Sequence, residues 1–140
     1  MATATHIRLP DDVDKALSSY AARVGAGKST VISQAVSEWL RAETHRGIAF
    51  VSEVTGERRA ALINGPQVWT IAEAWLQHEP EHREARELAD TLGLSPKSVA
   101  TALTYWADNR EEIDSIISRH HLAQDEALAT WERRQALGTA

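Results

Sequence analysis

The spacing of apolar residues at the start of the chain predicts a β-strand followed by two helices. Residues 3–9 alternate, with Ile7 and Leu9 on one face and His6 and Arg8 on the other, as in a strand with one buried face. Pro10 ends this strand because proline cannot donate to a ladder. The later apolar residues recur at the three- and four-residue spacing of a helix: Val13, Ala16, Leu17, Tyr20, Ala21 and Val24, and then Val31, Ile32, Ala35, Val36, Trp39 and Leu40.

Local signals predict where these two helices begin and end. Asp11 and Asp12 supply acidic side chains at the start of the first helix, which is expected to run to about Val24. Gly25 is expected to end it as a left-handed cap, and the second helix is expected to begin near Lys28.

The pattern changes after Glu43, and the rest of the chain predicts a hairpin followed by helices. The expected elements are strands at 48–54 and 58–63 around a turn at 55–57, helices from Val68 and at about 82–92, 96–108 and 110–120, and a helical tail, 121–140. In residues 85–106, Gly93 stands at a bend, Ser95 is a helix cap and Pro96 fits the first turn of the next helix, which is typical of a helix-turn-helix. With the hairpin beside it, this region is similar to a winged-helix unit.

Length and charge indicate two small domains with different roles. The 140 residues carry a net charge of -5, yet residues 1–45 hold five basic and five acidic side chains, so the acidity belongs to residues 46–140. An acidic region is better suited to a basic protein than to DNA. The absence of cysteine suits a reducing compartment, and neither a membrane span nor a signal-type apolar segment is evident, so we expect a cytoplasmic protein.

The N-terminal region is too small to form a core by itself. A single strand leaves its backbone groups unpaired, and two short helices cannot cover both its apolar face and each other. We therefore predict a homodimer in which two copies of the strand pair antiparallel and share one core. A two-stranded ribbon of this kind fits the major groove of DNA.

The segment Gly25-Ala26-Gly27-Lys28-Ser29-Thr30 superficially matches the end of a nucleotide-binding P-loop. The full pattern requires a glycine where this chain has Ala22, and it must follow a buried strand, whereas the preceding residues have a helical period. The ATP interpretation therefore fails, and the segment is expected to start the second helix.

Residues 3–42 resemble the ribbon-helix-helix DNA-binding family in the order of strand, proline, acidic helix start, glycine turn and second helix. The resemblance implies that operator DNA is read in the major groove by His6 and Arg8, with Ala4 where the family usually has a third polar reader. It also implies that Gly27, Lys28 and Ser29, at the N-terminus of the second helix, hold a backbone phosphate. Without the resemblance, a solvated strand face would be the simpler interpretation of His6 and Arg8.

Residues 46–119 are similar to a domain of unknown function that recurs in bacterial antitoxins. That similarity implies a cognate toxin protein, expected to be a PIN-like ribonuclease, and no cofactor. The tail has Leu122, Leu128 and Trp131 as a thin apolar stripe beside Arg133 and Arg134, so it either packs on its own domain or binds the toxin. The predicted fold is mostly α, with a ribbon-helix-helix domain (1–45), a winged-helix-like α-rich domain with a β-hairpin (46–120) and a toxin-binding tail (121–140).

Two other functions remain open at this stage. A stand-alone transcriptional repressor would use the C-terminal region for sensing or oligomerisation. A metal-dependent hydrolase would use His78, Glu79 and His82, which match zinc-binding patterns, but Pro80 between the histidines opposes the continuous helix that those patterns need. We therefore predict no metal site and no enzymatic activity.

Overall fold

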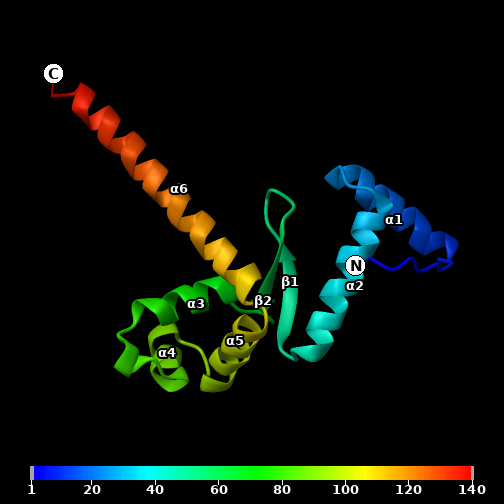
Figure 1. The fold of residues 1–140 in the computed structure, drawn as a ribbon, viewed down its shortest axis with the longest axis horizontal. Helices are drawn as coiled ribbons and strands as arrows, with labels where there is room; N and C mark the ends of the chain where they lie inside the picture. Colours follow the sequence, from blue (N-terminus) through cyan, green and yellow to red (C-terminus); the bar gives the residue numbers. More distant parts are fainter. Residues whose placement is uncertain (1, 140) are drawn as a thin grey trace. The chain divides into compact units, whose positions relative to one another are not determined.

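The computed structural model of the protein describes residues 2–139, which are mostly helical with one small antiparallel hairpin (Figure 1). The chain divides into two compact units, residues 1–44 and 45–140. In order, the elements are α1 (Asp11–Val24), α2 (Lys28–Thr44), β1 (Ile48–Ser52), β2 (Arg58–Leu62), α3 (Val68–Gln77), the 3-10 turn η1 (Pro80–His82), α4 (Ala85–Leu92), α5 (Pro96–Asp108) and α6 (Arg110–Leu137).

The N-terminal unit contains α1 and α2, and their predicted boundaries are confirmed. Gly25 has φ 69° and ψ 31°, the left-handed conformation that glycine adopts without a steric penalty, and its N–H donates to the carbonyls of Ala21 and Ala22. Because the residues before the GAGKST segment form a helix rather than a strand, they cannot support a P-loop.

Residues 2–10 form neither helix nor strand within the single chain. The sequence analysis predicts that residues 3–9 pair with the same residues of a second copy, because a strand exists only through its hydrogen bonds to a neighbouring strand. The single chain therefore does not contain the predicted strand, and the intertwined ribbon stays a prediction.

The hairpin of the C-terminal unit pairs β1 with β2 in the register Ile48↔Leu62 to Ser52↔Arg58. Both strands are shorter than the sequence predicted, because β1 leaves the ladder after Ser52 and β2 ends at Leu62, one residue before Ile63, whose N–H donates to the Gly47 carbonyl. The tip is closed by the Glu53 N–H, which donates to the Glu57 carbonyl at 2.7 Å.

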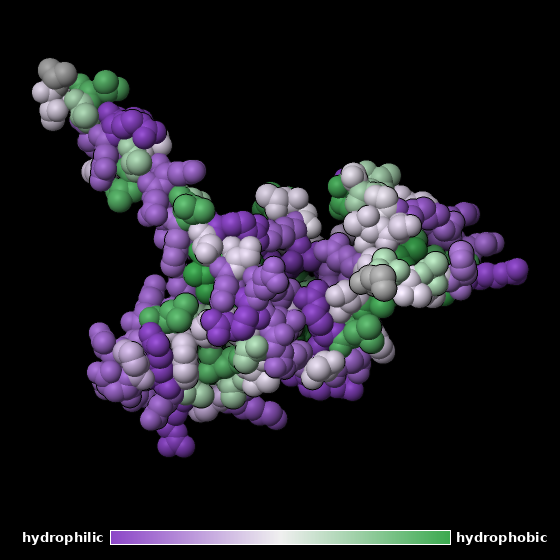
Figure 2. All heavy atoms as spheres, viewed as in Figure 1, coloured by the Kyte–Doolittle hydropathy of each residue, from purple (hydrophilic) through white to green (hydrophobic). Residues whose placement is uncertain are grey.

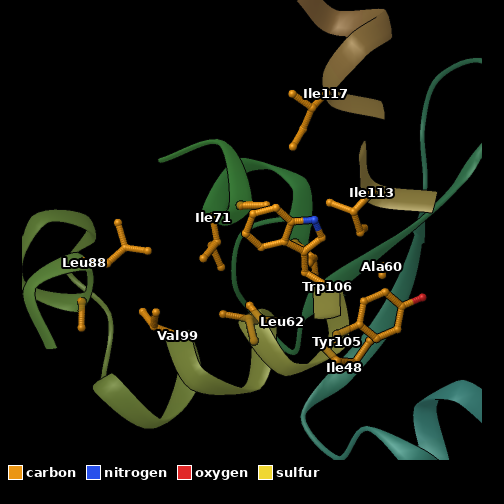
Figure 3. Close-up of a cluster of buried hydrophobic side chains, with 14 residues drawn as sticks. Ile48, Ala60, Leu62, Ile71, Leu88, Val99, Tyr105, Trp106, Ile113 and Ile117 are labelled. Atoms are coloured by element: carbon orange, nitrogen blue, oxygen red, sulfur yellow. The ribbon is translucent and has the colours of Figure 1, made fainter. Parts of the chain in front are cut away.

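Helix α5 is central to the C-terminal unit, because it contacts α3, α4, α6 and both strands. Tyr105 and Trp106 of α5 point into a cluster that includes Ile48, Ile71 and Ile113 (Figure 3). Tyr105 is fully buried, and its hydroxyl donates to Glu112 at 2.6 Å, so the polar end of this core residue is satisfied.

The connection from α4 to α5 follows the sequence prediction closely. Gly93 ends α4 in the left-handed conformation, and the Ser95 hydroxyl accepts a hydrogen bond from the Ser98 N–H at 3.0 Å. Pro96 occupies the first turn of α5, where its missing N–H costs nothing. The more specific winged-helix arrangement stays a prediction.

The later helices differ from the predicted ones in two places. The helix expected at 82–92 begins only at Ala85, as α4, because the separate 3-10 turn η1 ends at His82. Residues 121–137 are not a separate tail but continue α6 without a break. No helix within residues 2–139 combines the length and apolar character needed to cross a lipid bilayer.

Candidate functional site

The predicted base-reading residues lie on the exposed N-terminal segment. Ala4, His6 and Arg8 are all exposed, and so is Ile7 on the predicted buried face of the strand. Leu9 is half-buried. The segment thus leaves both its polar and most of its apolar side chains accessible to another molecule.

The predicted phosphate-binding residues gather at the N-terminus of α2. The carbonyl of Gly27 accepts from the Val31 N–H at 3.1 Å, so Gly27 is the capping residue and Lys28 and Ser29 begin the helix. A Cβ added at Gly27 would meet no atom within 4 Å, so this helix end is open to solvent. The Lys28 ammonium lies 2.7 Å from the Asp14 carboxylate of α1, a contact that sequence reasoning missed.

The apolar residues of the N-terminal unit are largely uncovered. Among residues 2–44, Ala21 is the one apolar residue that is fully buried. Trp39 remains 63% exposed and Val36 51% exposed. We use the name open apolar face for the exposed large side chains of this unit: Ile7, Val13, Val24, Val36, Trp39 and Leu40. Figure 2 shows hydrophobic atoms at the surface of this unit.

Polar contacts fasten the middle of α6 to the rest of the C-terminal unit. Arg119 donates to Glu57 at 2.7 Å, and His121 lies 2.5 Å from Glu73. The His120 ring packs against the Trp69 ring with centroids 4.6 Å apart and the two planes tilted by 48°. The hydrogen bond from Arg119 holds the pKa of the Glu57 carboxyl below its ordinary value, although partial burial opposes it, and the same bond raises the pKa of Arg119. These contacts mark where α6 leaves the body of the unit.

Beyond His121, α6 runs free of tertiary packing, and this distal part contains the predicted toxin-binding residues (Figures 1 and 2). Leu128 and Trp131 are exposed, three residues apart, and therefore share a face. Leu122 is nine residues before Trp131, which is two and a half turns at 3.6 residues per turn. The single apolar stripe predicted for Leu122, Leu128 and Trp131 is therefore wrong, because Leu122 lies on the opposite side.

The two arginines beside Trp131 differ in their surroundings. Arg133 donates to the hydroxyl of Thr130 at 3.0 Å, whereas Arg134 has no such bond to another described residue. At three residues from Trp131, Arg134 borders the face of Leu128 and Trp131, and Arg133, two residues away, points elsewhere. The structure thus brings Leu128, Trp131 and Arg134 together and leaves Arg133 apart.

The helix-turn-helix segment has a basic patch that sequence reasoning missed. Lys97 of α5 lines a pocket of about 310 Å³ together with Arg46, which is distant in sequence. Ser98 and Thr101 add hydroxyl groups to the same pocket. No sequence signal joins Arg46 to Lys97, because their proximity depends on the packing of α5 against the hairpin.

The segment His78-Glu79-Pro80-Glu81-His82 does not form a continuous helix. Helix α3 ends at Gln77 and Pro80 begins η1, as its sequence position predicts. The Nδ1 atom of His78 lies 2.8 Å from the Ala74 carbonyl, and Nδ1 of His82 lies 3.3 Å from Glu87. Within residues 2–139 no group of three or more histidine or acidic side chains is arranged to hold a metal ion.

Comparison of the chain with protein-family models, with curated proteins and with solved structures found no significant match.

Proposed function

We propose that the protein is a dimeric, DNA-binding antitoxin that represses its own operon and neutralises a ribonuclease toxin through its C-terminal helix. The class of DNA-binding module rests on the sequence resemblance to ribbon-helix-helix proteins. The class of toxin, a PIN-like ribonuclease, rests on the similarity of residues 46–119 to a domain found in antitoxins.

The observation that carries the proposal is the open apolar face of the N-terminal unit. The N-terminal unit has 44 residues, and Ala21 is the one fully buried apolar residue in its described part. Burial of so little apolar surface cannot offset the conformational entropy that the unit loses on folding. A second copy removes this deficit, because each large aliphatic side chain that becomes buried contributes about 1.5–3 kcal/mol. Pairing of residues 3–9 with their twin would at the same time satisfy the backbone groups of the N-terminal segment.

DNA binding follows from what such a dimer would expose. Ala4, His6 and Arg8 would line the outer face of the ribbon, where arginine reads guanine and contributes about 1–3 kcal/mol of discrimination. The N-terminus of α2 would add a phosphate contact through Lys28 and the free N–H groups of Ser29 and its neighbours. Base contacts would supply specificity, and phosphate contacts would fix the position.

Partner binding is supported by the distal part of α6. The part of α6 beyond His121 packs against no other element within residues 2–139, and a helical segment without a packed face is only marginally stable in water. Most helical stability in proteins comes from the packing of one face. Leu128 and Trp131 form an exposed apolar pair on one face, bordered by Arg134. This arrangement suits a groove that is apolar at its centre and acidic at one end, as expected close to the acidic centre of a metal-dependent nuclease.

The proposal is tested by two measurements on the full chain. In a gel shift with DNA from upstream of its reading frame, we expect Arg8→Ala to remove sequence-specific binding while sedimentation still shows a dimer. Affinity purification of a tagged copy expressed with its neighbouring reading frames should carry along a small nuclease. Binding to upstream DNA without any co-purified protein would instead favour the stand-alone repressor. Sequence-specific binding that Arg8→Ala retains would oppose the DNA-reading role of Arg8.

A further inference from the structure

The residue proposed to contact phosphate is already paired within the N-terminal unit. The Lys28 ammonium and the Asp14 carboxylate are 2.7 Å apart, and both side chains are half exposed. Asp14 lies in the first turn of α1 and Lys28 is the first residue of α2, so the contact joins the two helices.

Helix electrostatics explain why an anion belongs at this position. The N-terminus of a helix has a partial positive charge, so a lysine there is unfavourable unless a negative charge lies nearby. The first turn of α2 contains no acidic residue. Asp14 therefore supplies, from the neighbouring helix, the negative charge that the start of α2 lacks.

A DNA phosphate would bind the same ammonium and the same helix end. We propose that, at the Lys28 ammonium, Asp14 occupies the place of the phosphate in the free protein and thereby limits the affinity of the N-terminal unit for the nucleic-acid backbone. To bind DNA, Lys28 has to exchange the carboxylate for a phosphate, and the released carboxylate then repels that phosphate. Asp14 thus sets the strength of sequence-independent binding, and this role rests on the proposed function.

Asp14→Asn in the full-length protein tests the role of Asp14, with Asp12→Asn as the matched control. Asp12 lies in the same turn of α1, is exposed, and forms no ion pair with another described residue. Affinity is measured by fluorescence anisotropy with a random-sequence DNA duplex, because a phosphate contact does not depend on sequence. We expect Asp14→Asn to bind the duplex about two- to five-fold more tightly for each chain that engages a phosphate, which is the range for loss of an exposed ion pair. Asp12→Asn should change the affinity by less than about two-fold.

A double-mutant cycle with Lys28→Ala separates the pair from a general effect of charge. The gain from Asp14→Asn should disappear in the Lys28→Ala background, while the small effect of Asp12→Asn should remain. Equal effects of the two asparagine variants, a gain that persists without Lys28, or weaker binding by Asp14→Asn would each overturn the role of Asp14. Absence of DNA binding by the unsubstituted protein and by every variant would instead overturn the proposed function itself.

Discussion

Replacing Val36 with aspartate tests whether the open apolar face is covered by a second copy. Val36 is 51% exposed in the single chain, so a carboxylate there remains hydrated and the substitution acts mainly on contacts with a second copy. Dimerisation would bury the exposed half of the valine, which is worth about 0.8–1.5 kcal/mol for each chain. Two buried carboxylates add a desolvation cost of several kcal/mol each, so the total exceeds about 4 kcal/mol and the dimer should weaken by roughly a thousand-fold or more.

The assay is sedimentation equilibrium at micromolar concentration, accompanied by far-UV circular dichroism. We expect Val36→Asp to be monomeric and to lose helical signal from α1 and α2, because these helices lack a core without their twin. The control is Ser37→Asp, which adds the same charge on the polar side of α2 beside Ser33 and Gln34 and should leave the dimer intact. A Val36→Asp protein that sediments as a stable dimer would refute the argument from the open apolar face.

Three further changes test individual features. Gly25→Ala forces alanine into φ 69°, so the N-terminal unit should lose about 1–2 kcal/mol of stability, measured as a lower thermal midpoint at fixed concentration; an unchanged midpoint would contradict this. Because the pKa of Glu57 is lowered in the folded state, its pairing with Arg119 stabilises the C-terminal unit above about pH 4.5 and is lost as the pH falls through the lowered value. Arg119→Gln should therefore flatten the acid dependence of urea unfolding, and an identical pH profile would oppose it. In co-purification, Trp131→Ala should release the partner protein while Leu122→Ala retains it, and the reverse result would place the contact on the other side of α6.

The N-terminal helices could be predicted from the sequence because their boundaries are set by local chemistry. Gly25 needs only its own backbone conformation to end α1, and the acidic residues at the start of α1 need only the helix dipole. The predicted strand at 3–9 has no local determinant of this kind, because a strand needs a neighbouring strand for its hydrogen bonds and residues 2–10 form no strand within the single chain. The Asp14–Lys28 pair was also beyond prediction, because fourteen residues and a turn separate the two side chains.

In the C-terminal unit, the sequence predicted the element types more accurately than their extent. Ser95 and Pro96 mark the start of α5 unambiguously, as the serine cap confirms. The predicted end of the last helix near residue 120 was wrong, because apolar periodicity fades there although no helix-breaking residue occurs between Arg110 and Leu137. Periodicity reports packing against the rest of the domain, whereas helix continuation requires only that the backbone is not interrupted.

The geometry of α6 explains how a helix with so little amphipathic character can still present one specific face. Trp131 follows Ile113 by 18 residues, which is about five complete turns, so both point in the same direction from the helix axis. Ile113 is buried against the core of the C-terminal unit, and Trp131 is exposed beyond it. The partner-binding face that we propose is therefore the outward continuation of the face that already packs inside the unit. A partner groove on this face would take over the role that α3 performs for the first part of α6, and it would begin where the contact between His121 and Glu73 ends.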